Sequence, residues 1–90
     1  MIIGKVIGNV WATRKEEALR GLKFLVIQPL DRYEKTAGST LVATDMIGAG
    51  IGETVLVVQG SSARRIQGKE DIPVDAAVVG IIDSVEVESE

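Results

Sequence analysis

The stretch that decides the fold is DMIGAGIGETVLVVQGSSAR, residues Asp45–Arg64. It contains a loop with glycine at every second position, then the apolar run Val55–Val58, then a break at 60–62. Closely spaced glycines permit positive φ angles or a close approach of two backbones. A short apolar run between two breaks is typical of a buried strand. We therefore expect a compact loop, a buried strand and a polar turn.

Four other segments have the patterning of strands. In Ile2–Thr13 the even positions are all small or apolar, which indicates one buried face. Segments 14–20 and 64–71 are expected to hold short helical turns, the first ended by Gly21 and the second capped by Ser61 or Ser62. The other three of these strands are Leu22–Leu30, Ser39–Thr44 and Ala76–Val87. With the strand of the opening stretch, Val55–Gln59, the chain has five predicted strands.

These five strands predict an all-β fold. No long helix separates them, so parallel β-α-β units are not expected. A small five-stranded antiparallel barrel fits best, because closure removes exposed strand edges.

Two of the predicted strands are apolar on both faces. A small barrel has one inner face per strand, so some of these side chains are expected to point outward. Exposed apolar area favours association, and we predict a homo-oligomer. The candidate subunit-interface residues are Leu25, Ile27, Leu56 and Val58.

Composition excludes several classes of protein. Ninety residues predict one domain, spanning 1–90. The chain has no cysteine and no histidine, which removes disulfides and the commonest general base and metal ligand. No segment is apolar for long enough to span a membrane and no signal peptide is visible, so we expect a cytoplasmic protein without a membrane partner.

The runner-up hypothesis is a nucleic-acid-binding barrel. The net charge of −3 and the three aromatic residues oppose it, because such modules need a basic face and aromatic stacking platforms. Charge is also uneven along the chain. Residues 1–23 hold five basic and two acidic residues, and residues 70–90 hold seven acidic and none basic. Either this is solvated surface, or oppositely charged ends of neighbouring subunits meet.

Catalytic and ligand-binding motifs are weak. The loop G-A-G-I-G lacks the G-x-G-x-x-G spacing of a dinucleotide site, and a strand rather than a long helix follows it. Ser61 and Ser62 have no histidine to act as base. Carboxylates at strand ends could form an acid–base pair or hold a divalent cation. We expect them instead to cap backbone N–H groups or to pair with Arg64. They are Asp45, Glu53, Asp75 and Asp83. No catalytic, cofactor-binding or metal-binding residue is therefore assigned.

Nearly the whole chain, from Ile2 to about Val85, resembles the EutN/CcmL family, the vertex proteins of bacterial microcompartments. Its motifs are G-K-V-I-G-N-V near the N-terminus, G-A-G-I-G-E and G-S-S-A-R in the middle, and P-V-D-A-A-V-V-G-I-I-D at 73–83. Their order and spacing are specific in combination.

The resemblance implies an OB-like barrel that assembles as a homopentamer. Such rings look like caps for the five-fold corners of a polyhedral shell whose facets are hexameric shell proteins. It implies a structural protein without catalytic residues or a cofactor. The motif residues would then serve assembly, and Arg64 would form a structural ion pair. This assembly motif comprises Asp45, Gly48, Ala49, Gly50, Gly52, Glu53, Gly60, Ser61, Ser62, Ala63 and Arg64.

Overall fold

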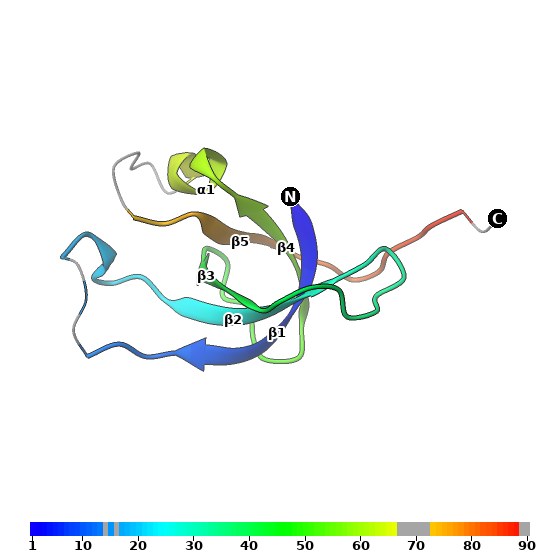
Figure 1. The fold of residues 1–90 in the computed structure, drawn as a ribbon, viewed down its shortest axis with the longest axis horizontal. Helices are drawn as coiled ribbons and strands as arrows, with labels where there is room; N and C mark the ends of the chain where they lie inside the picture. Colours follow the sequence, from blue (N-terminus) through cyan, green and yellow to red (C-terminus); the bar gives the residue numbers. More distant parts are fainter. Residues whose placement is uncertain (14, 16, 67–72, 89–90) are drawn as a thin grey trace.

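A computed structural model describes residues 1–13, 15, 17–66 and 73–88. The five predicted strands are present, with shorter bounds in several cases (Figure 1). No helix in the described ranges is long and apolar enough to cross a membrane. In chain order the elements are β1 (Ile2–Val10), η1 (Glu17–Leu19), β2 (Phe24–Leu30), β3 (Leu41–Asp45), β4 (Thr54–Gln59), α1 (Ser61–Ile66) and β5 (Ala76–Ile81).

The strands close into a barrel in the order β1-β2-β3-β5-β4, and β4 pairs back to β1. The predicted barrel is therefore confirmed. One pair differs from the all-antiparallel expectation, since β3 and β5 run parallel through Thr44↔Ala77 and Asp45↔Val78. The excursion through β4 and α1 returns the chain to run beside β3 in the same direction. A parallel pair thus arises here without a long crossover helix.

The inner face of the barrel is built from small and branched apolar side chains. Leu25 and Ile27 of β2 are fully buried there, beside Val6 of β1. The prediction that Leu25 and Ile27 point outward is therefore wrong. Val58 is also buried, in a second cluster, so its outward placement is wrong as well. Leu56 is half-buried between the fully buried Val55 and Val57, and its position fits the predicted outward face.

A β-bulge explains why the alternation in β1 does not continue to the strand end. Val6 pairs with Ile27, but Gly8 pairs with Val26, so Ile7 is the extra residue on β1. A bulge shifts the side chains beyond it to the other face. Val10, paired with Phe24 beyond the bulge, consequently lies on the outside of the barrel.

The second apolar cluster fixes α1 against the barrel. Ala63 of α1 is fully buried with Val58, Val74 and Ala77, and Leu19 of η1 packs on the same cluster. The helix begins at Ser61, so Ser61 and Ser62 lie in its first turn and Gly60 precedes it. The predicted start at Arg64 is therefore three residues late, and the predicted end falls among residues 67–72, outside the described ranges.

The last strand ends earlier than predicted. Its alternating tail suggested a strand as far as Val87, but β5 ends at Ile81. The backbone N–H of Ile82 still donates to the carbonyl of Thr54 at 2.8 Å. Residues 83–88 belong to no strand, and they leave the barrel as an extended segment, red in Figure 1.

Gly4 is required by packing. A Cβ built at Gly4 would overlap the Ile27 side chain and lie 3.3 Å from the Gln28 carbonyl oxygen. We expect Gly4→Ala to lower the free energy of unfolding by about 1–3 kcal/mol, because a filled core must shift to accept an extra methyl. Gly8→Ala is the matched control, since its Cβ would meet Val26 at an ordinary 3.8 Å. Thermal melts over a range of protein concentrations test this pair, because a loss of subunit packing persists at every concentration. Equal melting temperatures of the two variants throughout that range would contradict the packing role of Gly4.

Candidate assembly site

Asp45 organises the first half of the assembly motif. It ends β3, and its Oδ1 accepts hydrogen bonds from three successive backbone N–H groups: Ile47 at 3.1 Å, Gly48 at 3.0 Å and Ala49 at 3.2 Å. Gly48 has a φ of +82°, which favours glycine. The prediction that a strand-end carboxylate caps backbone N–H groups is confirmed at this position. Asp45 thereby defines the start of the glycine loop.

The charge of Asp45 is stabilised although its side chain is only 1% exposed. Burial raises the pKa of Asp45. The backbone donors from Ile47, Ala49 and Gly48, together with the Lys23 ammonium, lower the pKa by more than burial raises it, so the net shift is downward. The Lys23 Nζ lies 3.6 Å from Oδ2. Folding therefore favours the carboxylate form.

The second half of the glycine loop is tied to β1. Glu53 Oε1 accepts the Gly50 N–H at 2.6 Å, which confirms a capping role for a second strand-end carboxylate. The Gly52 N–H donates to the Val6 carbonyl at 2.8 Å, and the Val6 N–H donates to the Glu53 carbonyl at 3.0 Å. Ala49 is buried in the main core. The loop is thus a closed structural turn, with the N–H groups of 47–50, 52 and 53 bonded within the chain itself.

The segment around α1 forms the other part of the motif. Gly60 has a φ of +70°, and its N–H donates to the Asp75 carbonyl at 2.8 Å. Arg64 Nη1 donates to the Val74 carbonyl at 3.2 Å. In the described part of the chain no ion pair of Arg64 is found, so the predicted ion pair is replaced by a bond to a backbone carbonyl. Both bonds hold α1 and the residue before it to the segment that leads into β5.

The four carboxylates at strand ends have different surroundings. Among the described residues, no three acidic, histidine or cysteine side chains gather into a group that could hold a metal ion. Of the four carboxylates at strand ends, Asp45 and Glu53 hold backbone N–H groups of the loop. Asp75 and Asp83 are exposed, before and after β5. Asp45 and Glu53 therefore fix the backbone of the glycine loop at the end of the barrel.

Two features were missed at the level of the sequence. One is the Lys23–Asp45 ion pair, which joins the start of β2 to the end of β3 and follows from their pairing. The other is the capping of the predicted hairpin tip at 31–38, where Asp31 Oδ1 accepts the N–H groups of Tyr33 at 2.8 Å and Lys35 at 3.0 Å. An aspartate two residues before a turn apex is a signal for such a turn.

The structure has an apolar face on the outside of β1, β2 and β3, but this face consists of other residues than the predicted Leu25 and Ile27. Cross-strand partners share a face, so the pairs Gly8↔Val26, Val10↔Phe24 and Val26↔Val42 place one row of side chains together. Val42 is 48% exposed and the others are half-buried. We call this row the outer face; it comprises Gly8, Val10, Phe24, Val26 and Val42.

Two grooves meet at Phe24 on this outer face. One, of about 400 Å³, lies between the end of β1 and the start of β2, and its lining includes Trp11, Lys15 and Lys23. We call it the lysine groove. The other, of about 210 Å³, lies between β3 and the segment before β5, and its lining includes Val42 and Asp75. The outer face and its grooves form a broad apolar surface with opposite charges at its two sides.

Comparison with known proteins gives a consistent result. Residues 1–83 match the family model described as "Ethanolamine utilisation protein EutN/carboxysome". The chain is 49% identical to the carboxysome shell vertex protein CcmL of Synechococcus elongatus, over 99% of this chain and 90% of that protein. It is 52% identical to the bacterial microcompartment shell vertex protein GrpN of Rhodospirillum rubrum, over 96% of this chain and 97% of that protein.

Solved structures agree in shape as well as in sequence. The GrpN pentameric microcompartment shell protein from Rhodospirillum rubrum has a TM-score of 0.89 at 49% identity, with 98% of this chain and all of that chain covered. CcmL from Gloeobacter violaceus has a TM-score of 0.91 at 45% identity, with 98% of this chain and 91% of that chain covered. The barrel described above is thus similar to theirs over almost its full length.

Proposed function

This chain belongs to the EutN/CcmL family, and we propose that five copies of it close into a ring that caps a five-fold vertex of a bacterial microcompartment shell. The observation that carries this proposal is the full-length likeness to a shell protein whose structure is pentameric. Relatives named shell vertex proteins share 41–52% of their residues with the chain. The family is structural, so no catalytic reaction is assigned.

The subunit has a surface suited to ring closure. A ring needs a heterologous contact, in which one patch meets a different patch on the next copy. The outer face supplies an apolar patch that the described part of its own subunit leaves half open. Leu56 is a second candidate contact, because it lies outward on β4 and pairs with Ile3 of β1. We propose that the outer face is one side of the subunit contact.

The assembly motif supports the ring indirectly. Asp45 and Glu53 shape the loop before β4, and Gly60 and Arg64 fasten α1 to the segment before β5. These loops lie at strand ends, where a neighbouring copy can reach them. We propose that the motif presents backbone of fixed shape to the neighbour, without binding a ligand.

The wider partner is proposed to be a hexameric shell protein. Rings of five provide corners, whereas flat facets need units that tile a plane. The relatives are named shell vertex proteins, and this supports a partner that forms the facets between vertices.

Light scattering behind a sizing column tests the ring. We expect a mass near five times that of the 9.6 kDa chain, because each closed ring contains five subunits. A monomeric mass at micromolar concentration would overturn the proposal. The same sample, mixed with a hexameric microcompartment shell protein, is expected to give closed shells by electron microscopy, whereas the hexamer alone is expected to give sheets or open particles.

A further inference from the structure

The C-terminal segment Asp83–Glu88 is exposed except at Val85, which is half-buried. It leaves the barrel after Ile82 and belongs to no strand (Figure 1). Its side chains nevertheless alternate, with Val85 and Val87 on one side and Ser84, Glu86 and Glu88 on the other. An extended segment places alternate side chains on opposite faces. The segment therefore presents an apolar edge and an acidic edge.

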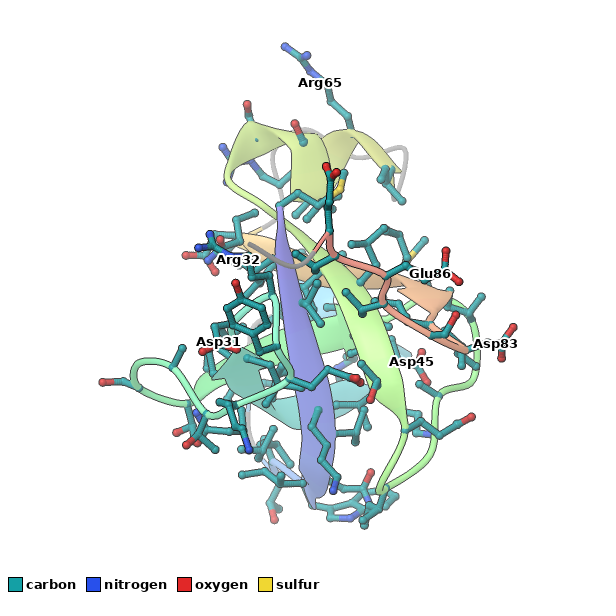
Figure 2. All side chains as sticks on the ribbon, turned by 90° about the vertical axis from the view of Figure 1, so that its right-hand side faces the viewer. Asp31, Arg32, Asp45, Arg65, Asp83 and Glu86 are labelled. Carbon is teal, nitrogen blue, oxygen red and sulfur yellow. The ribbon has the colours of Figure 1, made fainter. Side chains whose placement is uncertain are left out.

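The acidic groups of this segment are free to meet a partner. Glu86 and Glu88 are exposed, and Figure 2 shows Asp83 and Glu86 on the outside of the barrel. Val87 is 40% exposed, so its side chain also has area left to bury against a partner. Six extended residues span about 20 Å, which is long enough to cross a neighbour's groove.

The lysine groove has the complementary character. Trp11 is 90% exposed at its lining, and Val10, Leu22 and Phe24 supply further apolar surface. Lys15 and Lys23 bring positive charge to it. A large exposed aromatic side chain in an apolar groove is typical of the centre of a protein–protein contact. The second groove fits an acidic segment less well, because its lining includes Asp75.

The geometry excludes the subunit's own segment as the occupant. The C-terminal segment projects at one end of the molecule, and η1 and the end of β1 lie at the other (Figure 1). The long axis measures 48 Å. A copy of the same chain is the partner whose segment has the required charge and alternation, and a head-to-tail contact of this kind is the type that closes a ring.

We propose that the C-terminal segment of one subunit docks in the lysine groove of the next subunit in the ring. Val85 and Val87 pack against the apolar lining, and Glu86 and Glu88 lie near Lys15 and Lys23. This inference rests on the proposed ring of identical subunits, and it identifies which two parts of the chain meet. It also gives a residue-level reason for the basic start and acidic end of the sequence.

Disulfide trapping tests this contact, because the natural chain has no cysteine. Ala12, which lines the lysine groove, and Val87 are replaced together by cysteine. On a non-reducing gel we expect a ladder of covalent species up to five subunits, while each single variant gives at most dimers. The matched comparison is Val42→Cys with Val87→Cys, which places the acceptor at the second groove and is expected to give no ladder.

The outcomes separate this inference from the proposed function. A pentameric mass by light scattering without a ladder from the Ala12–Val87 pair would overturn the docking and leave the ring intact. A ladder from the Val42–Val87 pair would place the C-terminal segment in the second groove and would also overturn docking in the lysine groove. A monomeric mass would overturn the ring itself.

A charge exchange gives an independent measurement. Lys15→Glu and Glu86→Lys are each expected to raise the concentration at which the ring dissociates, by about tenfold. The double variant is expected to recover most of this loss, because the two charges are exchanged. Lys15 is preferred to Lys23, since Lys23 also pairs with Asp45. Additive losses in the double variant would show that the two residues do not face each other.

Discussion

Val26→Asp is expected to leave a folded subunit that no longer forms a ring, whereas Leu25→Asp is expected to unfold the subunit itself. The two residues are neighbours on β2, but Leu25 is fully buried in the main core and Val26 lies half-buried on the outer face. An unpaired carboxylate in the core costs several kcal/mol, which approaches the whole stability of a small domain, about 5–15 kcal/mol. The same carboxylate on the outer face remains hydrated in the monomer and is desolvated only in the ring.

Two measurements distinguish these effects. Light scattering is expected to show Val26→Asp as a species near 9.6 kDa, and circular dichroism is expected to show that it retains a cooperative thermal transition. Val26→Thr is the control, because it keeps the shape of the side chain without a charge and should remain in the ring. A Val26→Asp protein that keeps the pentameric mass and melting temperature would exclude the outer face from the subunit contact.

On β2 the buried and the outward faces are the reverse of the predicted ones. This strand shows which part of the fold the sequence could not predict. Strand existence and closure followed from short apolar runs and turn signals. Which face of β2 is buried could not be predicted in this way, because Phe24 and Val26 are as apolar as Leu25 and Ile27. Only the register decides it, since pairing with Val6 places Ile27 inside. Beyond that pair the register also depends on the bulge at Ile7, which sets Asn9 opposite Leu25. Gly8 indicates that β1 is irregular there, but it does not give the new register.

The C-terminal segment is a second place where the sequence pattern was misleading, because it predicted a longer strand than the structure has. Val85-Glu86-Val87-Glu88 alternates like a strand, yet β5 ends at Ile81. Alternation indicates two unlike faces, and it does not supply the partner strand that a ladder needs. The capping roles of Asp45 and Glu53 were predictable, because they require only local spacing. The Arg64 contact was not, because its acceptor is a backbone carbonyl ten residues away in the sequence.

Asp45→Ala is expected to be the most damaging substitution of a polar residue in the assembly motif. It removes the acceptor of three backbone N–H groups and the partner of Lys23. Hydrogen bonds to a charged group contribute about 1.5–3 kcal/mol each, and they share one oxygen here, so we expect a loss of about 2–4 kcal/mol in the free energy of unfolding. Glu17→Ala is the control. Its ion pair with Arg20 is shorter, at 2.7 Å, but both side chains are largely exposed, so little change is expected.

The pH dependence of this effect has a definite sign. The pKa of Asp45 is lowered in the folded state, because the backbone donors and Lys23 outweigh burial. Its contribution to stability is therefore complete above the pKa of an unfolded aspartate, about 3.9, and is lost as the pH falls through the lower folded pKa. Asp45→Asn cannot titrate, so the gap in unfolding free energy between the natural chain and this variant is expected to be largest at neutral pH and to narrow below about pH 4. Denaturant titrations at fixed protein concentration measure this gap, since ring formation itself adds concentration-dependent stability. A gap that stays constant from pH 7 to pH 3 would contradict the role of the Asp45 charge, and it would assign the loop's stability to shape alone.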